Sequence, residues 1–295
     1  MKGRGWPDLA ELTRLLLSLQ APSGAFESTV HAGNNSFSDY NGFVTAIVLR
    51  ELEAFAGLDG WSAPLERALD FLEECESPSR PGLFFFWPSH RWPRWAPRIP
   101  EDCDCTATIA SELLHYGRIG LDTAHKIVSA SLLPYRLPIA PESRGKPWIR
   151  PGVFLTWHYL GAAPNPVDIV VNVNVAAFLA QTGCTGHAAY GEVCRMIFDG
   201  ISWCSRQWEC LERLSPYYPE GWELVFALKN ALRRGAEELS APLEEIQRFN
   251  APVPGNDPSK ILFSMADRST VWSSTALWAA RRLARDYHPS GYAIR

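Results

Sequence analysis

The stretch CDCTATIASELLHYG, residues 103–117, has the pattern that decides the fold. Its apolar and small residues recur on nearly every side of a helix, and its charged residues are few. A helix that is apolar all round lies buried on all sides. Four other segments share this pattern, at 40–56, 168–182, 217–234 and 270–286. The sequence therefore predicts five buried helices.

Amphipathic helices with a charged face alternate with these buried segments along the chain. They are predicted at 8–20, 63–75, 121–133, 187–206 and 238–248. This alternation indicates two concentric layers, and Thr-Ala pairs at 45–46, 106–107 and 275–276 recur early in the buried helices. The predicted fold is all-α, an α/α barrel of helical hairpins with inner and outer layers, in one domain over residues 1–295. Long Pro-rich loops are expected at 76–101, 134–167 and 249–268.

The composition narrows the function classes. Hydrophobic residues make up 46% and charged residues 20%, and a net charge of −4 over mixed acids and bases argues against a face for nucleic acid. No apolar run approaches about 18 residues, so no transmembrane helix is expected. The N-terminus lacks the features of a signal peptide, and the seven Cys indicate reduced thiols. We expect a cytoplasmic protein, compatible with peripheral membrane contact, and the oligomeric state stays open.

The chain is rich in aromatic residues, with 12 Trp, 14 Phe and 9 Tyr. These residues fit either ordinary core packing or the lining of a cavity in which ring faces stabilise a cation. The residues that we consider for such a lining are Tyr40, Phe43, Trp87, Trp157, Tyr217, Tyr218, Trp222 and Trp272.

The stretch PEDCDCTAT, residues 100–108, opens the buried helix described first. Asp102 is a good N-cap, and this places Asp104 in the first turn, at the positive end of the helix dipole. Burial and a neighbouring carboxylate would hold a proton on Asp104. Cys105, Thr106 and backbone amides could stabilise its conjugate base, so the group could protonate a carbon–carbon double bond. The alternative is that Asp102 only caps the helix and Asp104 is solvated.

This motif resembles the Asp-X-Asp-Asp-Thr-Ala motif of class II terpene cyclases, the squalene–hopene and oxidosqualene cyclase superfamily. The loop at 20–26 is similar to the Gln-Trp repeat loops of that family, with Phe in place of Trp. With 295 residues, the chain looks closest to the single-domain class II cyclases of meroterpenoid pathways. By resemblance, Asp104 matches the general acid and Asp102 the residue that orients it. Cys105 replaces an Asp, which leaves open whether an alkene or an epoxide is protonated.

The resemblance implies an isomerase that cyclises a linear polyprenyl chain through proton-initiated carbocations, with a prenylated aromatic acid as the expected substrate. It implies no cofactor, and Mg²⁺ would enter only with a diphosphate substrate. Asn172 and Asn174 are expected either to bind Asp104 or the substrate, or to cap a buried helix. Arg94 and Arg98 either hold an anionic head group or belong to a solvated loop.

Several alternatives remain. A metal-dependent prenyltransferase-like enzyme would need an Asp-X-Cys pair, and Cys103-X-Cys105 alone is too little for a zinc site. A class I terpene synthase would need clustered carboxylates such as Asp-Asp-X-X-Asp, which the sequence lacks. A glycoside hydrolase would need two carboxylates that flank a sugar; Asp102 and Asp104 are too close in sequence for that, although Glu220 or Glu223 could be a distant partner. A non-catalytic helical-repeat binding protein would present a more polar concave surface.

Overall fold

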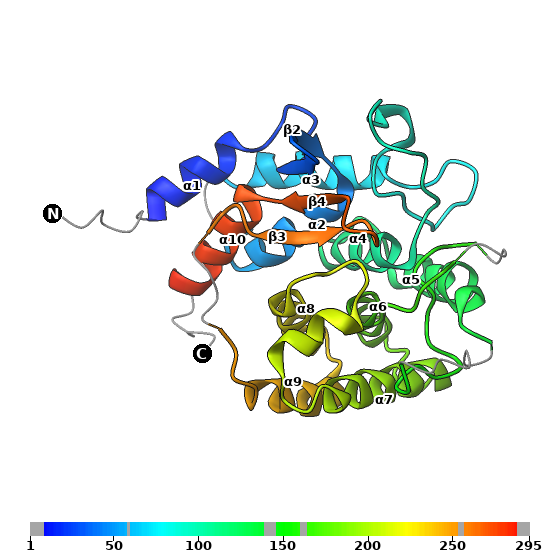
Figure 1. Ribbon diagram of the computed structural model, residues 1–295. Helices are drawn as coiled ribbons and strands as arrows, with labels where there is room; N and C mark the ends of the chain where they lie inside the picture. The colour runs from blue at the N-terminus through cyan, green and yellow to red at the C-terminus, as the bar shows by residue number, and fades with distance from the viewer. Residues whose placement is uncertain (1–8, 58–59, 139–145, 160–163, 253–256, 288–295) are drawn as a thin grey trace, which may run out of the picture.

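Helices and a small sheet make up the fold in the computed structural model, which describes residues 9–57, 60–138, 146–159, 164–252 and 257–287 (Figure 1). The strands are β1 (Glu27–Ala32), β2 (Asn35–Tyr40), β3 (Ile261–Ser264) and β4 (Thr270–Ser273). The α-helices are α1 (Leu9–Ser18), α2 (Gly42–Leu52), α3 (Ser62–Glu74), α4 (Cys103–His115), α5 (Leu121–Lys126), α6 (Ile169–Gln181), α7 (Ala188–Trp203), α8 (Gly221–Arg233), α9 (Ser240–Gln247) and α10 (Thr275–Asp286). A π-helical turn, Ile127–Leu132, continues α5, and short 3-10 turns lie at Glu53–Phe55, Ser89–Arg91, Leu133–Tyr135, Trp208–Leu214 and Glu237–Leu239.

The all-α class predicted from the sequence is wrong, and so is the barrel made of helical hairpins alone. The four strands form one antiparallel sheet in the order β2-β1-β4-β3. β1 and β2 pair across a two-residue turn that begins at Gly33, whose φ of 58° suits glycine. β1 also pairs with β4, with Thr29 opposite Ser273. The described chain is therefore a mixed α and β fold.

Two features hid the strands from local periodicity. Each strand has only four to six residues, too few for a reliable alternation of apolar and polar positions. The pairing of β1 with β4 joins segments from opposite ends of the described chain, so no neighbouring sequence announces it. β3 falls in the segment predicted as a Pro-rich loop, and β4 replaces the first turn of the helix predicted at 270–286.

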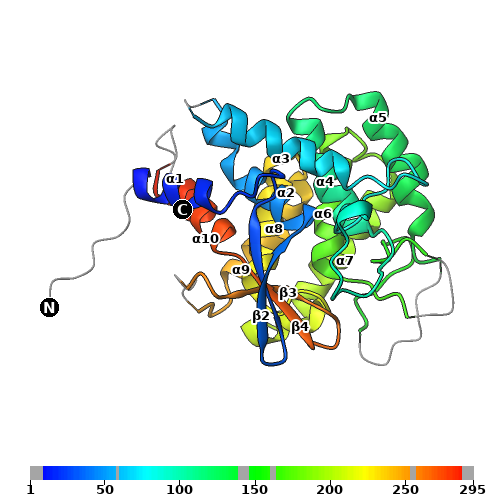
Figure 2. The same ribbon diagram turned by 90° about the horizontal axis from the view of Figure 1, so that it is seen from above.

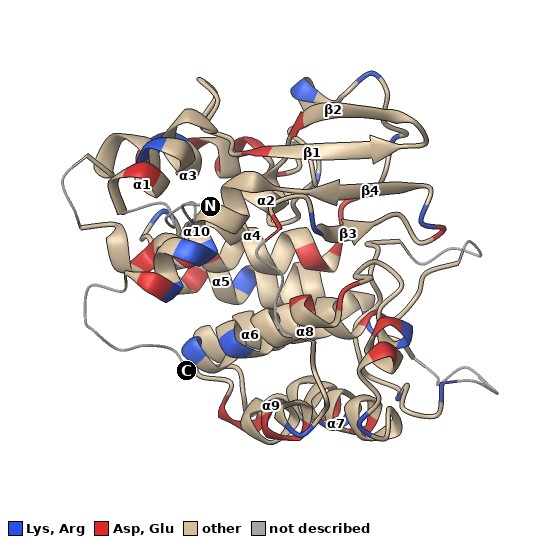
Figure 3. Ribbon diagram, turned by 60° about the vertical axis from the view of Figure 1, so that its left-hand side comes forward, with Lys and Arg blue, Asp and Glu red and all other residues tan. Residues whose placement is uncertain are grey.

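The segments predicted to be buried do form helices inside the molecule. All of α2, residues 103–113 of α4 and residues 169–179 of α6 are buried, which confirms this part of the prediction. α2 packs against α4, α4 against α6, and α6 against α8, while α10 packs against α2 and α1. α3, α7 and α9 cover the outside of this row (Figure 2). Of the covering helices, α7 carries both acidic and basic residues, whereas the charged residues of α9 are acidic (Figure 3).

The sheet lies at the N-terminal ends of two buried helices. β2 leads through Asn41 into α2, and β4 leads through Ser274 into α10. Both residues cap their helices, because the Asn41 side chain accepts a hydrogen bond from the Val44 amide and the Ser274 hydroxyl accepts one from the Leu277 amide. The strands are therefore held at the end of the molecule where these helices begin.

A repeated hydrogen bond fixes the loop before each of three buried helices. In each case a phenylalanine amide of the loop donates to a polar side chain one turn inside the helix, at a position four residues after the N-cap. The pairs are Phe26 to Thr45 at 3.1 Å, Phe84 to Thr106 at 3.1 Å, and Phe154 to Asn172 at 2.8 Å. This contact explains the recurrence of Thr45 and Thr106, whereas Thr275 directly follows the N-cap of α10 and is not equivalent to them.

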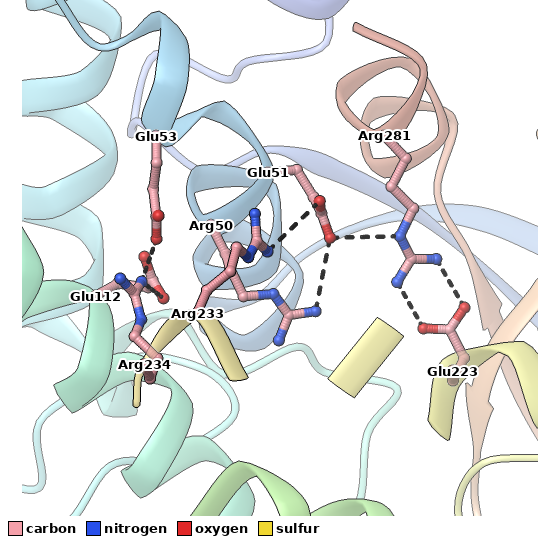
Figure 4. Close-up of polar contacts among 8 residues, drawn as sticks. All are labelled: Arg50, Glu51, Glu53, Glu112, Glu223, Arg233, Arg234 and Arg281. Carbon is pink, nitrogen blue, oxygen red and sulfur yellow. Dashed lines mark hydrogen bonds and ion pairs between the residues drawn. The ribbon is translucent and has the colours of Figure 1, made fainter. Parts of the chain in front are cut away.

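Buried ion pairs tie the helices to one another (Figure 4). Arg234, just after α8, donates to Glu112 of α4 at 2.9 Å and to Glu53, which follows α2. Arg281 of α10 donates to both oxygens of Glu223 of α8, at 2.7 Å each. Among the described residues, none of the helices has the length and apolar character needed to cross a bilayer.

Candidate active site

Asp102 is the N-cap of α4. Its backbone is extended, with φ −138° and ψ 160°, and its Oδ1 accepts a hydrogen bond from the Cys105 amide at 2.6 Å. Asp168 caps α6 in the same way. The cap directs the first turn of α4 inward, so that Asp104 is 7% exposed. The sequence-based alternative of a solvated Asp104 therefore does not describe this carboxyl group.

Two side chains from other elements hold the Asp104 carboxyl group. Asn174 of α6 donates from Nδ2 to Oδ1 at 2.7 Å, and the Tyr218 hydroxyl donates to Oδ2. Burial and the charge of Asp102 raise the pKa of Asp104, the hydrogen bonds from Tyr218 and Asn174 oppose this rise, and the resulting pKa is about 7. At neutral pH the protonated and ionised forms of Asp104 are therefore both populated.

Burial also raises the pKa of Asp102 to about 6, against the hydrogen bonds that Asp102 accepts from the helix terminus. The charge of ionised Asp102 helps to hold the proton on Asp104 as pH rises, because two close negative charges repel. In this arrangement Asp104 keeps its proton, and Asp102 is the neighbour that raises the pKa of Asp104.

A chain of contacts places Tyr218. Asp168 accepts hydrogen bonds through Oδ2 from the Ser215 hydroxyl and from the Tyr217 amide at 3.1 Å. The Ser215 Oγ in turn accepts from the Tyr218 amide at 3.2 Å. The segment before α8 is thus anchored on the cap of α6, which brings the Tyr218 hydroxyl to Asp104.

The acid lies at a cavity with a volume of about 380 Å³, within the size range of small-molecule sites. Aromatic side chains from α2, the loop before α4, the segment before α8 and the sheet form its wall, and Asp102, Asp104 and Cys105 contribute its polar floor. The aromatic lining residues are Phe43, Phe86, Trp87, Trp95, Trp157, Tyr217, Tyr218, Phe263 and Trp272. The site is therefore a protonatable carboxyl group enclosed by aromatic rings.

Most of the residues proposed from the sequence meet at this cavity, and some do not. Asn174 contacts Asp104, whereas Asn172 serves the loop contact of Phe154. Thr106 lies outside the lining and accepts from the Phe84 amide. Tyr40 is 40% exposed on β2 and does not line the cavity.

Trp222 lies in a different cavity of about 460 Å³ between α8 and α10, which contains neither Asp102 nor Asp104. Although this second cavity is larger, it has no counterpart of Asp104, whose carboxyl group accepts hydrogen bonds from Asn174 and Tyr218 at an aromatic wall. Of its carboxylates, Glu51 and Glu223 are paired with Arg281, and Asp257 accepts hydrogen bonds from Ser259. We therefore take the smaller cavity as the candidate site.

The two arginines expected to hold an anionic head group point elsewhere. The Arg98 guanidinium lies over the Trp92 ring, 4.6 Å from its centroid, and neither Arg94 nor Arg98 lines the cavity. Within the described part of the chain, no Lys, Arg or His lines this cavity, while Asp267 lies at the β3–β4 turn beside Ser269 and Thr270. The lining is therefore acidic and aromatic.

Sequence reasoning missed three of the aromatic residues of this wall and a carboxylate behind it. Phe86, Trp95 and Phe263 line the cavity, and Asp39 of β2 accepts hydrogen bonds from the indoles of two cavity tryptophans. Phe86 and Trp95 belong to an aromatic-rich loop whose signal was visible. Phe263 and Asp39 lie on strands that the sequence did not reveal, so no signal pointed to them.

A buried cysteine–histidine contact lies beside the site. Cys103 Sγ is 3.2 Å from His158 Nε2, and both side chains are buried outside the cavity lining. Burial lowers the pKa of His158 to about 3 and raises the pKa of the Cys103 thiol, so both groups are neutral. The described residues contain no cluster of three or more His, Cys, Asp or Glu side chains placed to bind a metal ion.

The fold and the site together define the protein as one that presents a tuned carboxylic acid to the contents of an aromatic cavity. No protein-family model matches the chain, and comparison with curated proteins finds no match. The function of the protein is therefore inferred from the geometry of its site and from the resemblance of residues 100–108 to the cyclase motif.

Proposed function

We propose that the protein is a class II terpene cyclase, which cyclises a linear polyprenyl chain by proton-initiated carbocation chemistry. The observation that carries this proposal is Asp104, a buried carboxyl group with a pKa of about 7 that borders an aromatic cavity. An acid for this reaction must carry its proton when the substrate arrives, and burial provides this property.

The reaction begins when Asp104 transfers its proton to the terminal alkene or epoxide of the chain. The electron pair of the double bond forms the new C–H bond, or the epoxide C–O bond breaks, and a tertiary carbocation results. Asn174 and Tyr218 already donate to the two oxygens of Asp104, so they stabilise the carboxylate as it forms. Internal double bonds then close the rings, transfer of a proton from the last cation to water ends the sequence, and solvent returns a proton to Asp104.

The lining supports an uncharged head group in place of the aromatic acid expected from the family resemblance. A carboxylate or diphosphate in this cavity would meet Asp102, Asp104 and Asp267, with no cation among the described lining residues. Taking an unpaired anion out of water is costly. A prenylated phenol or a polyprenyl alcohol avoids that cost.

The test is a panel of linear polyprenyl substrates analysed by mass spectrometry and NMR. The panel pairs a prenylated phenol with the matching prenylated hydroxybenzoate, and adds an epoxide and a diphosphate. Each is incubated with wild type, with Asp104→Asn and with added EDTA. We expect a product of unchanged mass with fewer alkenes, formed from the phenol, lost in Asp104→Asn and insensitive to EDTA. Release of diphosphate that EDTA abolishes would instead establish metal-dependent prenyl chemistry.

The pH profile gives a second readout of the same acid. Because only protonated Asp104 initiates the reaction, kcat/KM should fall tenfold per pH unit above a midpoint of about 7. Tyr218→Phe removes a hydrogen bond that lowers the pKa of Asp104, so the midpoint should move to higher pH while kcat falls by about tenfold or more. Tyr190→Phe, on α7 with its hydroxyl bound to Glu238, is the matched control and should leave the profile unchanged. A profile that is flat from pH 6 to pH 9 would contradict the assignment of the acid.

A further inference from the structure

A buried carboxylate stands behind the aromatic wall, and the reaction proposed above does not use it. Asp39 is 2% exposed and does not line the cavity. Its Oδ1 accepts a hydrogen bond from Trp87 Nε1 at 2.8 Å, and its Oδ2 accepts one from Trp272 Nε1 at 3.1 Å. Both tryptophans line the cavity, so Asp39 binds the indole N–H groups of two residues of its wall.

The remaining contacts of Asp39 fit a carboxylate. Asn41 Nδ2 donates to Oδ2 at 2.8 Å, and the Ser28 hydroxyl lies 3.4 Å from the same oxygen. Burial raises the pKa of Asp39, while the bonds from Asn41, Trp87 and Trp272 oppose that rise. Donors occupy both oxygens, and no Lys, Arg or His of the described chain forms an ion pair with Asp39. These neutral donors stabilise the ionised form of the buried Asp39 carboxyl group.

An unpaired buried charge is costly, and this one is held where it adds to the field in the cavity. A carboxylate that accepts from an indole N–H increases the electron density of the ring, and the ring face then attracts a cation more strongly. The wall is continuous, because Trp95 contacts both Trp87 and Trp272, at centroid distances of 5.6 and 6.4 Å. Phe263 stacks on Trp272 at 5.2 Å.

We propose that Asp39 is a positioning residue that acts through Trp87 and Trp272 to make this wall a binding surface for positive charge. The rings separate the Asp39 oxygens from the cavity, so the carboxylate can stabilise a carbocation without capturing it as an ester or removing its proton. For a carbocation formed in the cavity, this inference rests on the proposed function. For a cation that binds from solution, the inference is independent of the proposed function.

The test compares two ligands of equal shape, geranyltrimethylammonium and the hydrocarbon in which carbon replaces the nitrogen. Their dissociation constants are measured by quenching of tryptophan emission in the Asp104→Asn protein, in which the acid adds no charge of its own and cannot protonate the chain. We expect the ammonium to bind more tightly. The preference for the ammonium is the Kd of the hydrocarbon divided by the Kd of the ammonium. In Asp39→Asn this ratio should fall by about threefold to tenfold, the range of a cation–π interaction, while the Kd of the hydrocarbon stays unchanged.

A second set of variants covers the case in which Asp39→Asn does not fold. Trp87→Phe and Trp272→Phe each keep an aromatic face and remove one N–H bond to Asp39, so each should reduce the same ratio. Trp203→Phe is the matched control, because Trp203 lies on α7 beneath Arg213, outside the cavity, and should change nothing. A ratio that stays constant, or an equal loss of affinity for both ligands, would make Asp39 a structural contact and overturn the proposal.

Turnover separates this inference from the proposed function. The wild-type protein could cyclise no polyprenyl substrate while its preference for the ammonium depends on Asp39. In that case the cavity binds cations, the cyclase assignment is wrong, and the role of Asp39 stands. If it does cyclise, Asp39→Asn should increase the share of products that lose a proton before the last ring closes. If Asp39→Asn changes neither the product ratio nor the preference for the ammonium, the cyclase assignment stands and the proposed role of Asp39 is wrong.

Discussion

Asp104 illustrates how one residue combines function with a cost to stability. Its surroundings keep a proton on a group that would ionise readily in water, and the bonds from Asn174 and Tyr218 offset only part of the burial. From the sequence, the motif at 100–108 located this acid and its neighbour Asp102. It could not locate Tyr218 as the second donor, because a spacing of over one hundred residues carries no local signal.

Replacing Asp104 should therefore stabilise the protein at high pH. The pKa of Asp104 rises from 3.8 to about 7 on folding, so its contribution to stability is complete below pH 3.8 and is lost as pH rises through 7. Asp104→Asn removes this loss and should raise the free energy of unfolding at pH 8 by on the order of 2 kcal/mol relative to wild type. Urea unfolding of wild type and of Asp104→Asn at pH 4 and pH 8 measures this difference in the free energy of unfolding. An equal effect at both pH values would exclude a change of ionisation as the cause.

At the scale of the element, the helices were predictable and the sheet was not. Each buried segment carries its own periodicity, so the bounds of α4, 103–115, lie within two residues of the predicted 103–117. β3 and β4 gain their stability from pairing with distant residues, such as Thr29 with Ser273, and short strands have little intrinsic signal. The loop contacts of Thr45 and Thr106 were visible as a repeat, although their purpose was not.

Thr106 offers a test of that contact. Thr106→Val keeps the shape of the side chain and leaves the buried Phe84 amide without its acceptor, which should reduce the free energy of unfolding by about 1 to 3 kcal/mol. Thr108 lies in the same helix, and its hydroxyl is buried with no hydrogen-bond partner among the described residues. Thr108→Val should therefore be neutral or stabilising. Urea unfolding of both variants checks this, and equal losses would mean that the bond from Phe84 is not what Thr106 supplies.

At the scale of the whole molecule, ion pairs hold the helices at the end away from the acid. Asp104 and Glu112 lie at opposite ends of α4, and Arg234 joins Glu112 to Glu53 (Figure 4). Burial raises the pKa of Glu112, and the charge of Arg234 opposes that rise. The sequence pattern did not predict this assembly of charges, because its members lie on three separate segments of the chain.

Arg234→Met should cost about 3 to 5 kcal/mol of unfolding free energy at pH 8, because it leaves Glu112 buried without its cation. Adding Glu112→Gln should restore most of the loss, since the unpaired charge is then gone. Arg248 pairs with Glu245 at the surface, so Arg248→Met should cost less than about 0.5 kcal/mol. Denaturant unfolding of the three proteins provides the comparison. A double variant no more stable than Arg234→Met would show that packing, and not charge, accounts for the loss.

The pairing of β1 with β4 also sets an order of events during synthesis. The chain leaves the ribosome from its N-terminus, so residues 27–40 are made long before residues 261–273 that complete their sheet. The helices that carry Asp104 and Asn174 can assemble in the meantime, whereas Trp272 and Phe263 arrive late. Until β3 and β4 have been made, the cavity lacks these two rings of its wall, and the edge of β1 that pairs with β4 has no partner strand.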